Sequence, residues 1–551
     1  MALPALAVLT VLGSSVGQEV LTPLGPVRGR DYGDFVAFKG LPYAEPPERF
    51  GAPQPKRPWP SNETLDATRF RDACIHGGAH RDTDPTESFG AKREGLLPVV
   101  VWIHGGGFVK RSGSYPSFWG DGFVTDPEAP AILVTFNYRL GIFGFFSWEG
   151  AQANLGFRDQ QLLLRWVQEN IQAFGGDPGR VLLMGQSAGA MSVLCHIAAP
   201  GSAGLFHKAM ANSPVGLFYR SRPENDEFVR SVARAVLCFG ANVTSCLLRR
   251  PAFALRDTDI APEYLRHLTA PWTESANMLA WMPILDAETL PLNPLDAMQQ
   301  GKYNKVPTIL SSVTNETLAF VPTELMRLGN NWPSYHETLR IVFRERADKV
   351  AAHYAASPDS SALPPARRAA VVTTDALMTC YARYAARALA ARSETYLSTF
   401  MLQPHSSQMH LNSLCVEGPP AGASCHAADV LYQIPTSPRM TQRTKLFYAT
   451  DAESKLARHY TRAIIQFVSG RQSDFVRYNA SEVDAESTVS EEGSPTFLAD
   501  VVEPRVIAGN NLDSVRLFLS LNDCGPVNRR PLGTAASQIP AAGLAESPSL
   551  T

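Results

Sequence analysis

The sequence predicts an α/β fold in which a central, mostly parallel sheet carries helices on both faces. Two continuous apolar runs, Leu97–Ile103 and Ala131–Phe136, end in glycine or polar residues, as buried parallel strands do. Before a third run, Val181–Met184, apolar residues recur at three- and four-residue spacing over Leu155–Phe174, and Gly175–Pro178 ends this predicted helix. Strand, helix and strand in this order predict a right-handed βαβ unit, and hence a parallel sheet.

The first residues predict a secretory signal. Residues 1–17 contain an apolar run, Ala2–Leu12, followed by small residues, and this run is too short to span a bilayer. Because no Lys or Arg precedes the run, a buried first strand is the alternative. No other stretch has the length and apolarity of a transmembrane segment, and the C-terminus lacks a lipid-anchor signal.

The remaining elements predict one large domain over residues 18–524. Residues 24–38 alternate apolar and polar side chains around glycines, which indicates one or two strands at an antiparallel edge, and a proline-rich surface loop follows. Further predicted elements are strands at Val306–Leu310 and Thr395–Met401 and a helix at Asp451–Phe467. Residues 525–551 are rich in Pro, Ala and Ser and predict a disordered tail.

Composition narrows the function classes. With 50 basic and 52 acidic residues, the 551-residue chain has no basic excess that would favour a nucleic-acid partner. Eight cysteines without a C-x-x-C spacing suit an oxidising compartment better than zinc binding, and the trio Cys74, His76 and His80 lacks a fourth ligand. Four glycosylation sequons also favour export, at Asn62, Asn242, Asn315 and Asn479.

The centre of the prediction is Val181–Ser192. Its apolar run enters Gly185-Gln186-Ser187-Ala188-Gly189, and an apolar stretch that can continue as a helix follows. This order is typical of a nucleophile elbow, in which glycines let the chain reverse sharply and leave Ser187 exposed at the tip. The alternative is an ordinary glycine turn.

A second glycine motif fits the chemistry of the first. His104-Gly105-Gly106-Gly107 ends the predicted strand Leu97–Ile103. Consecutive glycines allow backbone N–H groups to approach a developing oxyanion, and the residue after the nucleophile, Ala188, can add another donor. We therefore expect Gly106, Gly107 and Ala188 to form an oxyanion hole.

The two glycine motifs belong to a longer ordered set. Its members are Phe38–Pro47, His104–Phe108, Asn137–Gly141, Trp166–Pro178 and Gly185–Gly189. Together they resemble the type-B carboxylesterase and cholinesterase family of α/β-hydrolases, from about residue 20 to about residue 525. The resemblance implies an α/β-hydrolase fold, no cofactor, and a small-molecule ester as substrate.

The resemblance also implies a catalytic triad in the order Ser, Glu, His. Glu316 follows the strand predicted at Val306–Leu310 and is the expected acid, with Asp286 as the alternative. His426, three residues before Asp429, is the expected base, with His405 and His410 as alternatives. Asn315 lies beside the expected acid, so we expect it to carry no glycan.

Disulfides are implied in the same way. Cys238 would pair with Cys246 and Cys380 with Cys524, while Cys415 and Cys425 are either a third bridge or two free thiols.

The chain departs from the family between Cys74 and Val99, where the resemblance implies that a strand of the central sheet is missing. This departure has three possible interpretations: a shortened but active enzyme, a catalytically impaired binding or adhesion module, or an incomplete gene model. The positions that correspond to pocket aromatics hold Asn277, Leu279 and Ala319, with Phe320 beside them. Gln186 replaces the acidic residue that commonly precedes the serine. We therefore expect a secreted serine carboxylesterase that accepts bulkier, neutral esters.

Overall fold

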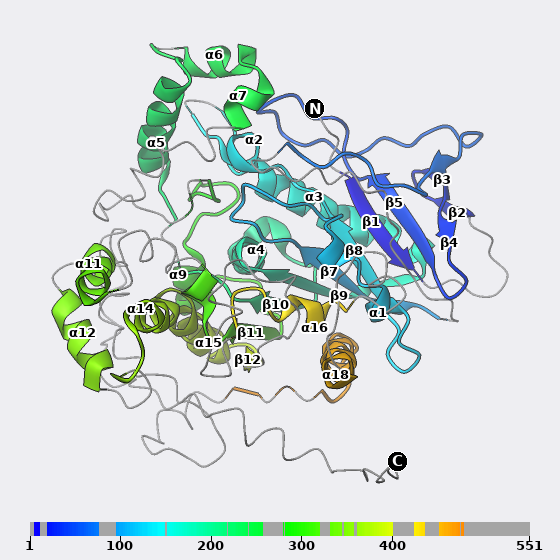
Figure 1. Cartoon of the computed structure of the whole chain (residues 1–551). Helices are drawn as coiled ribbons and strands as arrows, with labels where there is room; N and C mark the ends of the chain where they lie inside the picture. The colour runs from blue at the N-terminus through cyan, green and yellow to red at the C-terminus, as the bar shows by residue number, and fades with distance from the viewer. Residues whose placement is uncertain are drawn as a thin grey trace, which may run out of the picture.

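The computed structural model describes most of the predicted domain. It describes residues 5–10 (backbone only), 19–75, 95–148, 151–216, 219–240, 242–256, 279, 281–319, 331–343, 346–356, 361–400, 424–435, 451–473, 475 and 477–478. Two sheets and a surrounding set of helices make up this part of the chain (Figure 1).

The large sheet has nine strands in the order β12-β11-β10-β9-β7-β8-β1-β5-β4. The first six in this order run parallel, whereas β1, β5 and β4 pair antiparallel. Their bounds are β1 Ala5–Thr10, β4 Arg30–Asp31, β5 Val36–Pro42, β7 Leu97–Ile103, β8 Ile132–Phe136, β9 Gly176–Gln186, β10 Lys208–Asn212, β11 Thr308–Val313 and β12 Thr395–Phe400. The α/β prediction and its parallel sheet are confirmed.

A small second sheet lies at the end of the molecule where β5 and β4 lie. It comprises β2 (Glu19–Thr22), β3 (Gly25–Arg28) and β6 (Leu65–Asp66), with β2 and β3 antiparallel. The antiparallel edge that the sequence predicts over residues 24–38 is therefore divided between the two sheets, because Gly29 separates β3 from β4.

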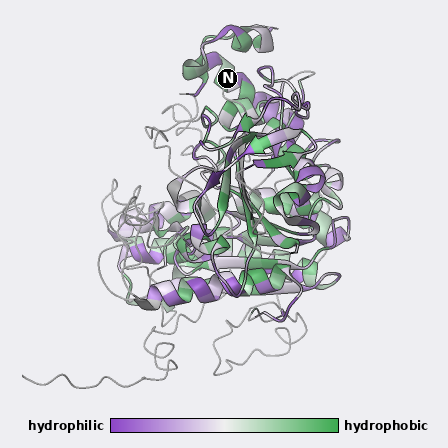
Figure 2. Cartoon of the chain, turned by 90° about the vertical axis from the view of Figure 1, so that its right-hand side faces the viewer, coloured by the Kyte–Doolittle hydropathy of each residue, from purple (hydrophilic) through white to green (hydrophobic). Residues whose placement is uncertain are grey.

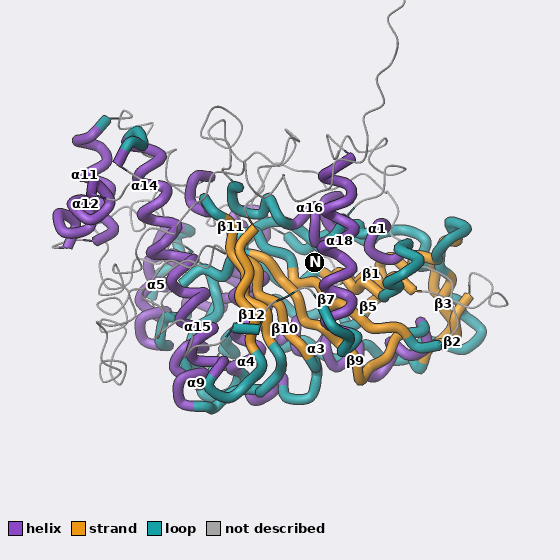
Figure 3. The backbone as a smooth tube through the Cα atoms, turned by 90° about the horizontal axis from the view of Figure 1, so that it is seen from below, coloured by secondary structure: helices purple, strands orange, loops and turns teal. Residues whose placement is uncertain are grey.

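Helices cover both faces of the large sheet, as Figure 3 shows from below. One face carries α3 (Leu155–Asn170), α4 (Ala188–Ala198), α9 (Pro294–Gln300) and α15 (Cys380–Ala390); the other carries α1 (Asp121–Val124), α16 (Val430–Gln433) and α18 (Asp451–Val468). Outside these layers lie α2 (Gly141–Phe145), α5 (Arg222–Ala235), α6 (Val243–Arg249), α7 (Ala252–Arg256), α11 (Trp332–Phe343), α12 (Ala347–Ala356) and α14 (Pro365–Thr374).

Each central strand contributes side chains to two hydrophobic cores, one on each face of the sheet, because successive side chains alternate between the faces. Along β7, Val99, Val101 and Ile103 enter the core beneath α3 and α4, whereas Val100 and Trp102 enter the core beneath α18. All five side chains are fully buried. This explains why the strands read as continuous apolar runs, which appear as hydrophobic ribbon in the interior in Figure 2.

Strand β1 corresponds to the alternative given for the first residues, a buried first strand, although the sequence did not indicate its place in the sheet. It pairs antiparallel with β8 on one side and with β5 on the other, with Leu6 opposite both Phe136 and Leu41. Neither β8 nor β5 has an unpaired edge at that place. Within the shortened segment between Cys74 and Val99, residues 76–94 lie outside the described residues. The missing strand therefore stays a prediction, while β1 supplies a strand between β8 and β5.

The predicted signal and this strand use the same residues. Cleavage after Gly17 would remove β1, so one molecule cannot both lose residues 1–17 and keep the strand. Secretion remains a prediction. Among the described residues, no helix has the length and apolarity needed to cross a membrane.

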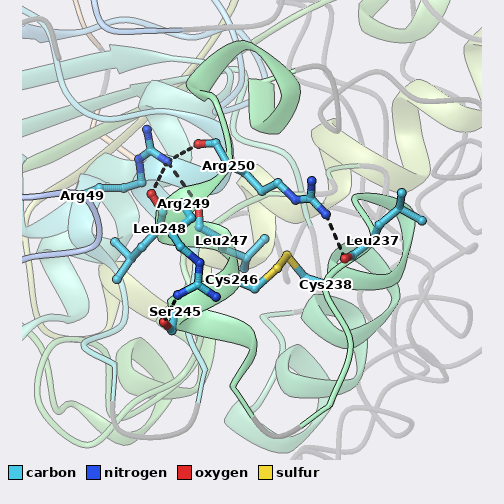
Figure 4. The surroundings of a disulfide bond; sticks show 9 residues. All are labelled: Arg49, Leu237, Cys238, Ser245, Cys246, Leu247, Leu248, Arg249 and Arg250. Carbon is cyan, nitrogen blue, oxygen red and sulfur yellow. Dashed lines mark hydrogen bonds between the residues drawn. A yellow bond between two sulfur atoms is a disulfide. The ribbon is translucent and has the colours of Figure 1, made fainter.

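A helical unit, α5 to α7, projects from the sheet (Figure 1). The disulfide between Cys238 and Cys246 closes the loop between α5 and α6, as predicted. In Figure 4, the guanidinium of Arg49 binds the carbonyl oxygens of Leu247, Leu248 and Arg250 at 3.2, 3.0 and 2.6 Å. A cation at the carboxyl end of α6 complements the helix dipole and ties the unit to the body of the protein.

The other cysteine and glycosylation predictions have mixed outcomes. Cys380 and Cys425 are disulfide-bonded, but their predicted partners, Cys524 and Cys415, lie outside the described residues. Asn62 and Asn242 are exposed, as glycan acceptors must be, whereas Asn479 lies outside the described residues. These pairings and modifications therefore remain predictions.

Candidate active site

Ser187 lies at a sharp turn between β9 and α4. Its backbone has φ 59° and ψ −124°, a conformation that costs about 1–3 kcal/mol for a residue other than glycine. The glycines on either side permit the turn: a Cβ on Gly189 would lie 2.0 Å from the carbonyl oxygen of Ile103, and one on Gly185 would lie 2.5 Å from that of Gly189. The local geometry is that of a nucleophile elbow.

Glu316 and His426 form a buried pair. Glu316 Oε2 accepts a hydrogen bond from His426 Nδ1 at 2.6 Å, and the side chains are 0% and 5% exposed. The second carboxylate oxygen, Oε1, accepts the backbone N–H of Val313 at 2.8 Å. A carboxylate that holds Nδ1–H leaves the lone pair of the neutral ring on the other nitrogen, Nε2, where it can accept a proton.

Backbone pairing brings the acid and the base together across 110 residues of sequence. Asn315 N–H donates to the carbonyl oxygen of Ser424 at 2.9 Å, and Asn315 and Cys425 form an isolated parallel bridge. Asn315 is half-buried, and its side-chain amide donates to Thr314 Oγ1 at 3.2 Å. This supports the expectation that Asn315 carries no glycan.

The loop after β7 approaches the elbow closely. A Cβ on Gly105 would lie 2.6 Å from the carbonyl oxygen of Gln186 and 3.0 Å from Ser187 Cβ, so glycine is required there. Among the described residues, neither Gly106 nor Gly107 donates its N–H to a backbone acceptor. Ala188 is the first residue of α4, whose leading N–H groups have no partner within the helix. Donors for an oxyanion are therefore available on both sides of Ser187.

Tyr138 contacts this loop at His104, and its neighbour Arg139 is held by an ion pair. Tyr138 stacks on the His104 ring at 4.5 Å, and its hydroxyl donates to the His104 carbonyl oxygen at 2.9 Å. The next residue, Arg139, forms a buried two-point ion pair with Asp159 at 2.8 and 2.7 Å. The Asp159 charge raises the pKa of Arg139 against the opposing effect of burial. The motif Asn137–Gly141 therefore lies against the glycine loop that follows β7.

The predicted substrate-binding residues are only partly described. The side chain of Leu279 lies against Gly107, since a Cβ on that glycine would be 3.3 Å from Leu279 Cδ2. Ala319 ends the short 3₁₀ helix that Glu316 begins. Asn277 and Phe320 lie outside the described residues.

Beneath Ser187 and the Glu316–His426 pair lies a buried polar network that the sequence interpretation missed. Asn212 accepts the Ser187 N–H with its carbonyl oxygen at 2.9 Å and donates its side-chain amide to Gln433 at 2.8 Å. Gln433 in turn donates to Asp429 Oδ2 at 2.8 Å. Burial, and then the charge of Glu316, raises the pKa of Asp429 to about 7. Only the acidic residue three positions after His426 signalled this network in the sequence.

One contact of the base was also missed. Gln186 Nε2 lies 3.1 Å from His426 Nε2, whereas Ser187 Oγ makes no hydrogen bond among the described residues. The sequence identified Gln186 only as an unusual residue, because spacing along the chain does not reveal which side chain meets the histidine.

The alternative site residues have other surroundings. Asp286 Oδ1 accepts from the backbone of Thr289 and Leu290 at 2.6 and 2.9 Å, so it caps a turn. His405, His410, His76 and His80 lie outside the described residues. Cys74 is buried, and burial raises the pKa of its thiol to about 12.

Comparisons with known proteins identify the same family as the sequence motifs. The profile of the Carboxylesterase family matches residues 17–482. The para-nitrobenzyl esterase of Bacillus subtilis (strain 168) is 35% identical over 55% of this chain and 64% of the relative. The juvenile hormone esterase of Tribolium castaneum is 34% identical over 57% of this chain and 58% of the relative. The chain thus spans less than two thirds of the length of these two relatives.

A solved structure of a thermophilic PNB esterase is also similar. It superposes with a TM-score of 0.68 at 27% identity, covering 84% of this chain and 94% of the other. The family match extends over most of the chain, and the structural match covers 84% of it. This chain belongs to the carboxylesterase family and has the α/β-hydrolase fold.

Proposed function

We propose that this protein is a carboxylic ester hydrolase with Ser187 as its nucleophile and an acyl-enzyme intermediate. The observation that carries the proposal is the buried Glu316–His426 pair, joined at 2.6 Å, beside a serine held in a strained turn. The esterase names of the relatives support the same reaction class.

In the proposed reaction, His426 Nε2 takes the proton of Ser187 Oγ while that oxygen attacks the ester carbonyl carbon. Backbone N–H groups of Gly106, Gly107 and Ala188 stabilise the oxyanion; one such donor is typically worth about 2.7–4 kcal/mol. His426 then gives its proton to the leaving alcohol. Water repeats the sequence on the acyl-enzyme, and Glu316 fixes the tautomer of the base throughout.

For the substrate we propose uncharged esters with bulky acyl groups. Leu279 lies beside Gly107 and gives the site an aliphatic side, and Gln186, next to His426, is uncharged. Asn277, Ala319 and Phe320 complete the proposed acyl-binding residues. A cationic choline ester would find less attraction here than a neutral one.

The second candidate, a binding or adhesion module without catalysis, loses its main support. It depended on a gap in the sheet, and in a chain that keeps residues 1–17 this place is filled by β1, paired with β8 and β5.

Export is a separate part of the proposal, with glycans at Asn62 and Asn242, which are exposed, and at Asn479. Mass spectrometry of protein recovered from the medium would identify its N-terminus and its glycans, and a mature chain that begins near residue 18 would show that β1 is lost.

Hydrolysis of p-nitrophenyl acetate and p-nitrophenyl hexanoate tests the function. Ser187→Ala should lower kcat by at least about 10³-fold. Ser192→Ala, which changes another buried serine in α4, should retain activity. Equal rates for the wild type and Ser187→Ala would refute the proposal.

A further inference from the structure

The side chain of Gln186 lies between Gly105, in the loop proposed to form the oxyanion hole, and His426, the proposed base. It is 2% exposed and comes from the last residue of β9, immediately before Ser187. Its Oε1 faces Gly105, where a Cβ would lie only 3.0 Å away, and its Nε2 lies 3.1 Å from His426 Nε2. Gln186 is therefore packed in place and directed at the ring nitrogen that the reaction uses.

The protonation state of the His426 ring determines whether Gln186 or His426 is the donor in this contact. Glu316 accepts the Nδ1–H of His426, so Nε2 of the neutral ring carries a lone pair and no hydrogen. The amide nitrogen of Gln186 can donate to that lone pair. Ser187 needs the same lone pair to lose its proton, and a ring nitrogen accepts one strong hydrogen bond.

We propose that Gln186 is a positioning residue that occupies the acceptor nitrogen of His426 in the resting protein. Reaction then begins when the hydrogen bond from Gln186 to His426 is replaced by one from Ser187. In the step itself the Ser187 O–H bond and the π bond of the ester carbonyl break. The Nε2–H and Oγ–carbon bonds form, and the π electrons become a lone pair of the oxyanion; the ester is the only other reactant. This inference rests on the proposed function.

The amide of glutamine suits this role because it presents both a donor and an acceptor. Once His426 is protonated, Nε2 carries a hydrogen, and a half-turn of the Gln186 amide offers Oε1 to it. A methionine of similar length offers neither hydrogen bond. A glutamate at this position accepts but cannot donate when ionised, so it favours the protonated ring, which cannot take the serine proton.

Two substitutions of similar size should therefore act in opposite directions. Gln186→Met should raise the second-order rate constant for organophosphate labelling of Ser187 by about fivefold, the effect of releasing one neutral hydrogen bond. Its kcat for p-nitrophenyl acetate should rise while KM stays unchanged. Gln186→Glu should slow labelling by about tenfold, as expected for a charged hydrogen bond that must be broken.

Gln160→Met is the matched control. Gln160 is 1% exposed, and its Oε1 lies 3.1 Å from Nε2 of another buried histidine, His196. Because this pair lies apart from the triad, Gln160→Met should leave the labelling rate of Ser187 unchanged. Thermal unfolding of all three variants would verify that they fold.

The outcomes separate this inference from the proposed function. Opposite effects of the Met and Glu substitutions at Gln186 would support the inference, since a purely packing role makes both variants slower. If wild type labels at Ser187 and Gln186→Met is equal or slower, the inference is wrong while the function stands. If neither wild type nor Gln186→Met reacts at Ser187, both are wrong.

Discussion

Replacing Asp429 with asparagine should change how stability depends on pH. Asp429 is fully buried; its Oδ2 accepts from Gln433, and its Oδ1 has no hydrogen-bond partner in the described part of the chain. Burial, followed by the charge of Glu316, raises its pKa to about 7. Asparagine can keep the bond from Gln433 with its side-chain oxygen and never ionises.

The direction in which stability changes with pH follows from the number of protons that the native and unfolded states bind. An aspartate in the unfolded chain titrates near pH 3.9, so between about pH 4 and 7 the native protein holds one proton more than the unfolded chain. The native state therefore loses stability relative to the unfolded state as pH rises through this window, and the loss is constant above it. A window of about three pH units corresponds to about 4 kcal/mol.

Thermal unfolding of wild type and Asp429→Asn from pH 4 to pH 8 would measure this loss. The Tm of Asp429→Asn minus that of the wild type should increase by about 4 °C between pH 4 and pH 7, whatever its value at pH 4. The reason is that 1 kcal/mol shifts the Tm of a chain of this length by about 1 °C. In the presence of Glu316→Gln the growth should be smaller, since that change removes the second cause of the raised pKa. Parallel curves for the two proteins would refute the reasoning.

Two further predictions concern the framework of the site. Deleting residues 1–17 removes β1 and leaves the facing edges of β8 and β5 unpaired, so soluble yield and Tm should fall, whereas deleting residues 525–551 should change neither. An unchanged Tm after the first deletion would show that β1 is dispensable, as the proposed export requires. Arg139→Met leaves the buried Asp159 charge without its partner and should cost about 3–5 kcal/mol in urea unfolding. Adding Asp159→Leu should recover most of that loss, and an additive second loss would contradict this account.

Much of the fold could be predicted from local patterns. Continuous apolar runs identified β7, β8 and β9, because parallel strands buried on both faces lack polar positions. The helix predicted at Leu155–Phe174 is α3 followed by a 3₁₀ turn, and Gly175 ends it with φ 85°. The elbow could be predicted because its strand, turn and helix are adjacent in sequence.

What the sequence did not reveal depends on contacts between distant residues. An apolar N-terminal run has the same composition in a signal peptide and in a buried strand, and the sequence does not show the pairing of this run with β8 and β5. The contact between Gln186 and His426 joins residues 240 positions apart. The link from Asn212 through Gln433 to Asp429 likewise depends on where α16 packs beneath the sheet.

Direct observation of the acyl-enzyme tests the central claim most closely. Wild-type protein mixed with a slowly deacylating p-nitrophenyl ester, quenched in acid and digested, should carry the acyl group on the peptide that contains Ser187. His426→Ala and Glu316→Gln should reduce the rate of that acylation, while Ser187→Ala should abolish the adduct. Acylation at another residue, or an adduct on Ser187 whose rate does not depend on His426, would contradict the account.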